Sequence, residues 1–235
     1  MTSEPATESN RAGRPRREKR PWPLWVHLLL ALLLVALLRN FVVQSFYVPS
    51  SSMEHTLNVS DRVVVSKYTH DFQRGDVVVF DGTDTFGGGS EARFTGALGG
   101  VVNGVARVFG IRPGEKDYVK RIVGVGGDKV ACCDTNGKIT VNGTPIEEPY
   151  LGSGVAPSQT EFSVQVPANH FFMLGDNRDN SADSRAHLAD PGGGMIAKDD
   201  VIGKPLLRYW PLDRLGGVDG GTNSKLAAVP GASGS

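Results

Sequence analysis

The chain has 235 residues, and its 25 basic and 25 acidic side chains leave no formal net charge. A basic head, an apolar run and a glycine-rich tail leave about 165 residues for a folded body with one core. The first twenty residues hold six basic groups and three acidic ones, so the rest of the chain is mildly acidic. This charge distribution argues against a body that binds nucleic acid.

Residues 1–20 form the basic head, and residues 21–43 contain the apolar run WPLWVHLLLALLLVALL. Read alone, the cluster RPRREKR in the head is also typical of a nucleic-acid tail or of a solvated, disordered segment. An apolar stretch of about 17 residues with snorkelling flanks can just cross a hydrocarbon core of about 30 Å. We therefore predict a basic cytoplasmic tail followed by one transmembrane anchor in the lipid bilayer.

The basic head also predicts the orientation of the anchor, with the N-terminus in the cytoplasm and everything after Arg39 translocated. A cleaved signal peptide is the alternative. The stretch RNFVVQSF after the run offers no small-x-small cleavage site and carries a charge where cleavage should occur, which favours a retained anchor. The sequence contains no second apolar run of this length. We predict a single-pass protein of the cytoplasmic (cell) membrane with an extracytoplasmic domain over 44–215.

The body contains short, valine-rich apolar runs separated by turn residues. Such runs predict a mainly β protein built on an antiparallel sheet. Candidate strands cover residues 62–67, 76–80, 117–125, 129–132, 138–141, 161–166, 170–174 and 201–209. The pair Asn142-Gly143 after KITV is typical of a hairpin turn.

Two glycine-rich segments show no clear pattern of helix or strand. Residues 81–116 lie between two strong strand predictions, which indicates an insertion or a mobile loop. Residues 216–235 are rich in glycine, alanine and serine, and we predict that they are disordered.

The sequence does not indicate metal or cofactor chemistry. Its five histidines are scattered without metal-binding spacing. The acidic run GDNRDNSADSR fails as a calcium loop, because Arg178, Ser181 and His187 stand where a ligand, a glycine and a glutamate are needed. We expect neither a metal nor a cofactor.

Cys132 and Cys133 are adjacent, and neighbouring residues on a strand point to opposite faces. Two thiols are too few for a four-ligand zinc site. A vicinal disulfide needs an oxidising compartment and unusual geometry, so we favour two separately packed thiols.

Two segments could carry nucleophilic chemistry. The loop PSSSMEHTL at 49–57 reads, by itself, as a polar linker. In the strand 117–125, the period of two puts Lys120 on one face with Tyr118 and Ile122. Burial there would lower the lysine pKa from about 10.4 by up to about 3 to 5 units, and a neutral amine could deprotonate a serine. A solvated edge residue is the alternative for a lone strand lysine, and Arg121 cannot be the base because its guanidinium does not deprotonate.

Four segments together resemble the bacterial type I signal peptidases, the Ser/Lys enzymes that remove signal peptides from exported proteins. PSSSM is similar to the family box P-S-x-S-M, and DRVVVSKYTHDFQRGDVVVF ends in the family's R-G-D-V-V-V-F. YVKRIVGVGGD is similar to K-R-x-x-G, and GDNRDNSADSR to G-D-N-R-x-x-S-x-D-S-R. The boxes occur in the family's order, and the similarity spans residues 44–210.

The resemblance implies a membrane-anchored serine endopeptidase that cuts signal peptides from exported preproteins through an acyl-enzyme. Family substrates carry small residues, usually in an Ala-x-Ala pattern, before the cut. By position, Ser52 would be the nucleophile and Lys120 the general base. The hydroxyl of Ser50 would join the Ser52 N–H in an oxyanion hole.

Further residues would support the implied dyad or bind substrate. Ser181 would hydrogen-bond Lys120 and hold it towards Ser52, while Asp183 and Arg185 would form a supporting ion pair. A polar loop of this composition also makes turns through side-chain bonds alone. Shallow apolar substrate pockets would be lined by Val48, Pro49, Met53, Leu57, Tyr118 and Val119, whose alternative is ordinary core packing.

Two positions depart from the family pattern, since His55 and Gly126 both stand where proline is usual. Neither belongs to the implied dyad, but His55 offers a second base three residues from Ser52. Two other functions stay open. The chain could be a catalytically inactive, β-rich membrane adaptor that binds exported chains, or a self-cleaving Ser/Lys peptidase.

Overall fold

The computed structural model describes residues 22–41, 43–68, 70–83, 85–86, 117–218 and 229, with the backbone alone at 36–41 and 43. The predicted cytoplasmic tail and most of the predicted insertion at 81–116 lie outside the described residues. The chain divides into two compact units, Met1–Val35 and Ala36–Ser235, and each is treated by itself.

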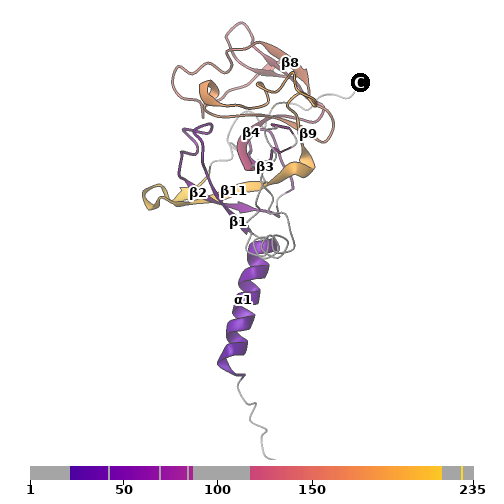
Figure 1. Cartoon of the computed structure of the whole chain (residues 1–235). Coiled ribbons are helices and arrows are strands. Elements are labelled where there is room, and N and C mark those ends of the chain that lie inside the picture. Colours follow the sequence, from indigo (N-terminus) through magenta and orange to yellow (C-terminus); the bar gives the residue numbers. More distant parts are fainter. Residues whose placement is uncertain are drawn as a thin grey trace, which may run out of the picture. The chain divides into compact units, whose positions relative to one another are not determined.

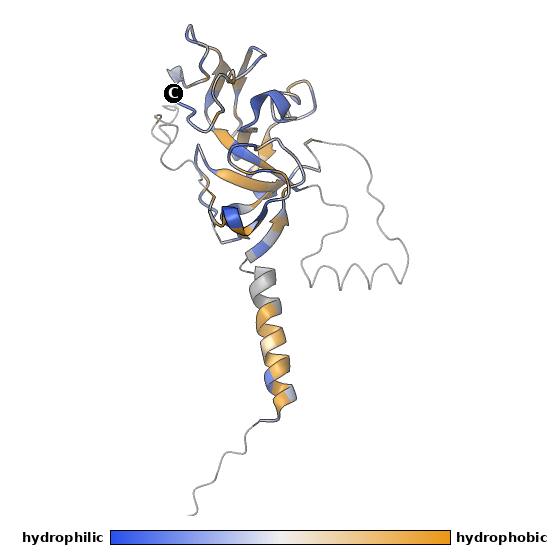
Figure 2. Cartoon of the chain, turned by 90° about the vertical axis from the view of Figure 1, so that its left-hand side faces the viewer, coloured by the Kyte–Doolittle hydropathy of each residue, from blue (hydrophilic) through white to orange (hydrophobic). Residues whose placement is uncertain are grey.

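The helix α1 covers Leu24–Phe41. Leucine and alanine favour helix strongly, and they dominate this segment. Figure 2 shows that α1 is hydrophobic along most of its described length. A search of the described residues finds no helix that is both long enough and apolar enough to cross a membrane.

The second unit is mainly β, as predicted, and all its strand pairs are antiparallel. Its larger sheet has the order β1-β2-β11-β3-β4-β9-β10, with β12 paired to β11 (Figure 1). These strands are β1 Val43–Tyr47, β2 Arg62–Ser66, β3 Val77–Asp81, β4 Asp117–Val125, β9 His170–Leu174, β10 Ile196–Ala197, β11 Val201–Trp210 and β12 Gly216–Gly217.

A smaller sheet has the order β7-β6-β5-β8. Its strands are β5 Lys129–Cys132, β6 Thr140–Val141, β7 Thr144–Pro145 and β8 Phe162–Gln165. Three short 3-10 helices complete the described elements: η1 Arg178–Asn180, η2 Lys198–Asp200 and η3 Leu212–Arg214. The predicted hairpin joins β6 to β7, and Asn142 and Gly143 both have positive φ, as a tight hairpin turn requires.

Four residues of the tail that was predicted to be disordered, 216–218 and 229, lie among the described residues. Gly216 and Gly217 form β12 because their backbones pair with β11, which needs no apolar side chain. Val229 is buried in a core cluster with residues of both sheets, and its carbonyl accepts a hydrogen bond from Arg74 Nη1. The remaining residues of the tail beyond Val218 lie outside the described residues.

The interpretation of the two cysteines as separate thiols is wrong, because Cys132 and Cys133 form a vicinal disulfide. The peptide bond between the two cysteines is cis.

Strands β3 and β4 are buried on both faces. Val78, Phe80 and Ile122 belong to one buried cluster, and Val77 and Val79 belong to another. Lys120 is paired with Val78, so it lies on the face of Ile122, as the strand period predicts. Lys120 itself is buried.

Candidate active site

The structure brings Ser52 and Lys120 into direct contact. Lys120 Nζ donates a hydrogen bond to Ser52 Oγ over 2.6 Å, although the two residues are 68 positions apart. Both side chains are buried, with 3% of Lys120 and 8% of Ser52 exposed. Ser50 Oγ lies 3.3 Å from Ser52 Oγ. A hydroxyl and an amine so enclosed can exchange a proton without competition from water.

Ser52 is held by a compact turn that follows β1. The Leu57 N–H donates to the Met53 carbonyl at 2.7 Å, and the Glu54 N–H donates to the Ser51 carbonyl at 3.0 Å. Met53 and Leu57 are fully buried in the cluster that contains Val77 and Val79. The packing of these two apolar residues in the core fixes the position of the turn and of Ser52.

Burial lowers the pKa of Lys120 to about 8. The carboxylates of Asp183 and Asp176 oppose this shift because they favour the charged amine, whereas the guanidinium of Arg185 supports it. A substantial fraction of the amine is therefore neutral near pH 8. Only the neutral amine can accept the proton of Ser52.

The turn over residues 51–57, called the serine turn below, also forms hydrogen bonds with the segment that follows β9. The backbone N–H of Asn177 donates to the Ser52 carbonyl at 3.1 Å. Its side-chain Nδ2 donates to the Ser51 carbonyl at 3.1 Å, and Asn180 Nδ2 donates to Ser51 Oγ at 2.8 Å. Sequence reasoning missed both asparagines, although each lies in the segment GDNRDNSADSR that it had singled out.

Gly175 lies where β9 passes the serine turn. A Cβ at this position would overlap both Ser181 Oγ and the Ser52 carbonyl oxygen. Only glycine therefore allows this close approach. Sequence reasoning also missed this residue, and the only available signal was its place at the start of the same segment.

Asp183 and Arg185 form an ion pair with a contact of 2.8 Å. Burial alone would raise the pKa of Asp183, but hydrogen bonds and the charge of Arg185 lower it below its usual value, with smaller contributions from the Gly175 N–H and Ser181. The Gly175 N–H donates to Asp183 Oδ2 at 3.0 Å. The ion pair thus fixes the backbone beside Ser52.

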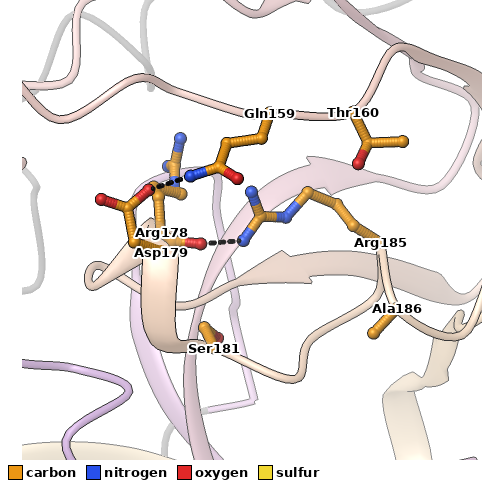
Figure 3. Close-up of a pocket in the computed structure, with 7 residues that line it drawn as sticks. All are labelled: Gln159, Thr160, Arg178, Asp179, Ser181, Arg185 and Ala186. Carbon is orange, nitrogen blue, oxygen red and sulfur yellow. Dashed lines mark hydrogen bonds between the residues drawn. The ribbon is translucent and has the colours of Figure 1, made fainter.

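Ser181 does not make the hydrogen bond to Lys120 that the resemblance implied. Its Oγ is buried and, among the described residues, has no partner of good hydrogen-bond geometry, although it lies near enough to Asp183 to help lower the pKa of that carboxyl. Ser181 lines a pocket of about 200 Å³ together with Arg185. Figure 3 shows this pocket, with Arg185 reaching the carbonyl of Arg178.

A second buried ion pair adjoins Lys120. Arg121 Nε and Nη2 donate to the two carboxylate oxygens of Asp176 at 2.8 Å and 2.7 Å. Thr56, near the end of the serine turn, donates its hydroxyl to the same carboxylate. Arg121, which follows Lys120, and Asp176, which follows Gly175, are thereby linked to the turn that carries Ser52.

The predicted substrate-pocket residues lie around this turn, and their role remains a prediction. Val48 and Val119 pack in the same cluster as Met53 and Leu57. Tyr118 packs against the opposite cluster, and Pro49 is exposed. Most of the set therefore also satisfies the core-packing alternative.

The rival base His55 is exposed, and no hydrogen bond within the described part of the chain joins it to Ser52. Its backbone has a φ of 81°, and its imidazole lies against Gly152. The geometry thus favours Lys120 over His55 as the base. Across the described residues, no group of three or more His, Cys, Asp or Glu side chains could hold a metal ion.

Comparison with known proteins gives consistent matches. A family model described as "Signal peptidase, peptidase S26" matches residues 22–210. A probable signal peptidase I of Mycobacterium leprae is 34% identical over 91% of this chain and 84% of that protein. Signal peptidase I of Mycobacterium tuberculosis is 35% identical over 92% of this chain and 82% of its own length.

A crystal structure of a signal peptidase I from Enterococcus faecalis is also similar, at 21% identity and a TM-score of 0.37. The match covers 57% of this chain and 96% of that one.

Proposed function

Because this chain belongs to the signal peptidase family, peptidase S26, a family of serine endopeptidases that remove signal peptides, we propose how its own residues perform that reaction. Ser52 attacks the carbonyl carbon of the scissile bond while neutral Lys120 takes its proton. The observation that carries this proposal is the 2.6 Å contact between Lys120 Nζ and Ser52 Oγ in a buried setting.

The attack yields a tetrahedral intermediate and then an acyl-enzyme on Ser52. Lys120 returns the proton to the leaving amine and then activates the water that hydrolyses the ester. Within the described residues the Ser52 N–H donates no hydrogen bond, so it is free to serve the oxyanion. The neighbouring hydroxyl of Ser50 is the second donor, and each such donor is typically worth about 2.7 to 4 kcal/mol in the transition state.

The substrates are signal peptides of exported preproteins, cut after small-x-small sites. The enzyme is held in the cytoplasmic membrane by the apolar run within 21–43, with residues 1–20 inside and the peptidase domain outside. The basic head and the apolar run that follows it in the sequence support this placement.

The test is cleavage of a preprotein with an Ala-x-Ala site by the full-length protein. Ser52→Ala and Lys120→Ala are each expected to abolish cleavage, whereas His55→Ala should leave it largely intact. Full activity in Lys120→Ala would exclude the dyad, and full activity in both variants would favour an adventitious peptidase. An intact mass after prolonged incubation of the wild type would exclude self-cleavage.

A further inference from the structure

A half-buried aromatic ring covers Arg121, the residue that follows the proposed base. The guanidinium of Arg121 lies 3.9 Å from the centroid of the Tyr150 ring, a cation–π arrangement. Tyr150 comes from the irregular segment between β7 and β8, and its hydroxyl donates to Glu148 Oε1 at 2.7 Å. Burial, followed by the charge of Glu148, raises the pKa of Tyr150 well above its usual value. The hydroxyl therefore remains protonated and keeps donating.

Glu148 in turn pairs with Arg178, which begins η1. Arg178 Nη1 donates to Glu148 Oε2 at 3.0 Å, and Nη2 donates to Oε1. These side chains are only 1% and 3% exposed. Arg121 is paired with Asp176 in the same way, so the buried group holds two cations and two anions. A buried ion pair is tolerated only when both partners remain in place.

Each of the two ion pairs is also connected by a hydrogen bond to the serine turn or to Gly175 beside it. Arg121 reaches the turn through Asp176, whose carboxylate accepts the hydroxyl of Thr56. Arg178 reaches it through Gly175, because Arg178 Nε donates to the Gly175 carbonyl at 3.0 Å. Gly175 is the residue that abuts the Ser52 carbonyl and Ser181.

We infer that Tyr150 and Glu148 are positioning residues of the peptidase, and that together with Arg121 and Arg178 they form a clamp that holds Ser52 against Lys120. Tyr150 and Glu148 touch neither of these two residues. They act by fixing Asp176 and Gly175, between which the serine turn is held. This inference rests on the proposed function and extends it to a segment outside the four family boxes.

The experiment measures the rate at which a small serine-directed inhibitor acylates Ser52. It also measures kcat and KM for a peptide substrate. Both rates are divided by the concentration of titrated active sites. Tyr150→Leu removes the ring and the hydroxyl, and we expect acylation and kcat to fall together by about 10- to 100-fold with KM little changed, because small misplacements cost that much. Tyr150→Phe keeps the ring over Arg121 and should restore most of the rate. Glu148→Gln should resemble Tyr150→Leu.

Two other side chains serve as matched controls. Glu147 forms an exposed ion pair with Lys138, so Glu147→Gln should leave the rate unchanged. Tyr209 shares a hydrogen bond with Ser45, so Tyr209→Phe tests the general cost of losing a tyrosine hydroxyl. Both controls should match the wild type.

If Tyr150 and Glu148 only stabilise the fold, their variants should have fewer titratable active sites, and each remaining site should have the wild-type acylation rate and kcat. That result in Tyr150→Leu or Glu148→Gln would overturn the inference. If Tyr150→Leu does not fold, Glu148→Gln decides in its place. A wild-type rate per site in Glu148→Gln would then refute the clamp. Failure of the wild type to be acylated at Ser52 would instead refute the proposed function.

Discussion

Lys120 is the residue on which the proposed chemistry depends, and its surroundings set its protonation state. Burial lowers its pKa to about 8, while Asp183 and Asp176 limit the shift. The amine lies 2.6 Å from Ser52 Oγ, the group that it would deprotonate.

The pH dependence of the reaction follows from this shift. Below pH 8 the amine is protonated and cannot accept a proton, so kcat/KM should fall about tenfold per pH unit on the acid side and level off above the pKa. A profile measured from acid to mildly alkaline pH checks this. A rate that is flat through pH 8 would contradict it.

Asp183→Asn gives a sharper form of this test. Asp183 is the carboxylate that most favours the charged form of Lys120, so its loss should lower the pKa of Lys120 further and move the acid limb of the profile to lower pH. The loss also leaves Arg185 unpaired, which acts in the same direction. A limb that moves to higher pH would show that Lys120 is not the titrating base.

At the scale of elements, the serine turn meets the segment after β9 at Gly175. We expect Gly175→Ala to reduce kcat by about 100-fold, because its Cβ would displace the Ser52 carbonyl or Ser181. Gly216→Ala is the control, since a Cβ there has no atom within 4 Å. Equal activity of the two variants, measured by preprotein cleavage, would show that this close approach is unimportant.

Strands that consist of an apolar run between turn residues could be predicted from the sequence. β4, β5 and β9 have the predicted bounds, because each supplies its own buried side chains. β1, β10 and β12 were not predicted, since they are defined by backbone pairing with β2, β9 and β11 and have no valine-rich run of their own. The cis link between Cys132 and Cys133 has no local signal either.

The same distinction applies to the site. Ser52 and Lys120 could be proposed because each lies in a recognisable segment. The roles of Asn177, Gly175 and Tyr150 depend on contacts with residues far away in the chain. For Ser181, the hydrogen bond to Lys120 that its position implied is absent among the described residues, and its role remains a prediction.

At the scale of the whole molecule, the larger sheet provides the frame for the site. β3 and β9 flank β4, so the strand that carries Lys120 is central and fully paired. The serine turn directly follows the edge strand β1, which begins two residues after α1 ends. The nucleophile is thus only about a dozen residues from the predicted anchor.

The predicted topology can be tested in membrane vesicles of known orientation. In right-side-out vesicles, added protease should digest the peptidase domain and leave the basic head of residues 1–20 protected. Vesicles of inverted orientation provide the control and should show the reverse. Release of the intact protein by a carbonate wash would contradict the anchor.

The most direct test of the central claim is covalent labelling of the full-length protein by a serine-directed acylating inhibitor of the penem type, mapped by mass spectrometry. We predict a single adduct on the peptide that contains Ser52, absent from Ser52→Ala and strongly slowed in Lys120→Ala. An adduct on another serine, or preprotein cleavage by a preparation that is never labelled at Ser52, would contradict the account.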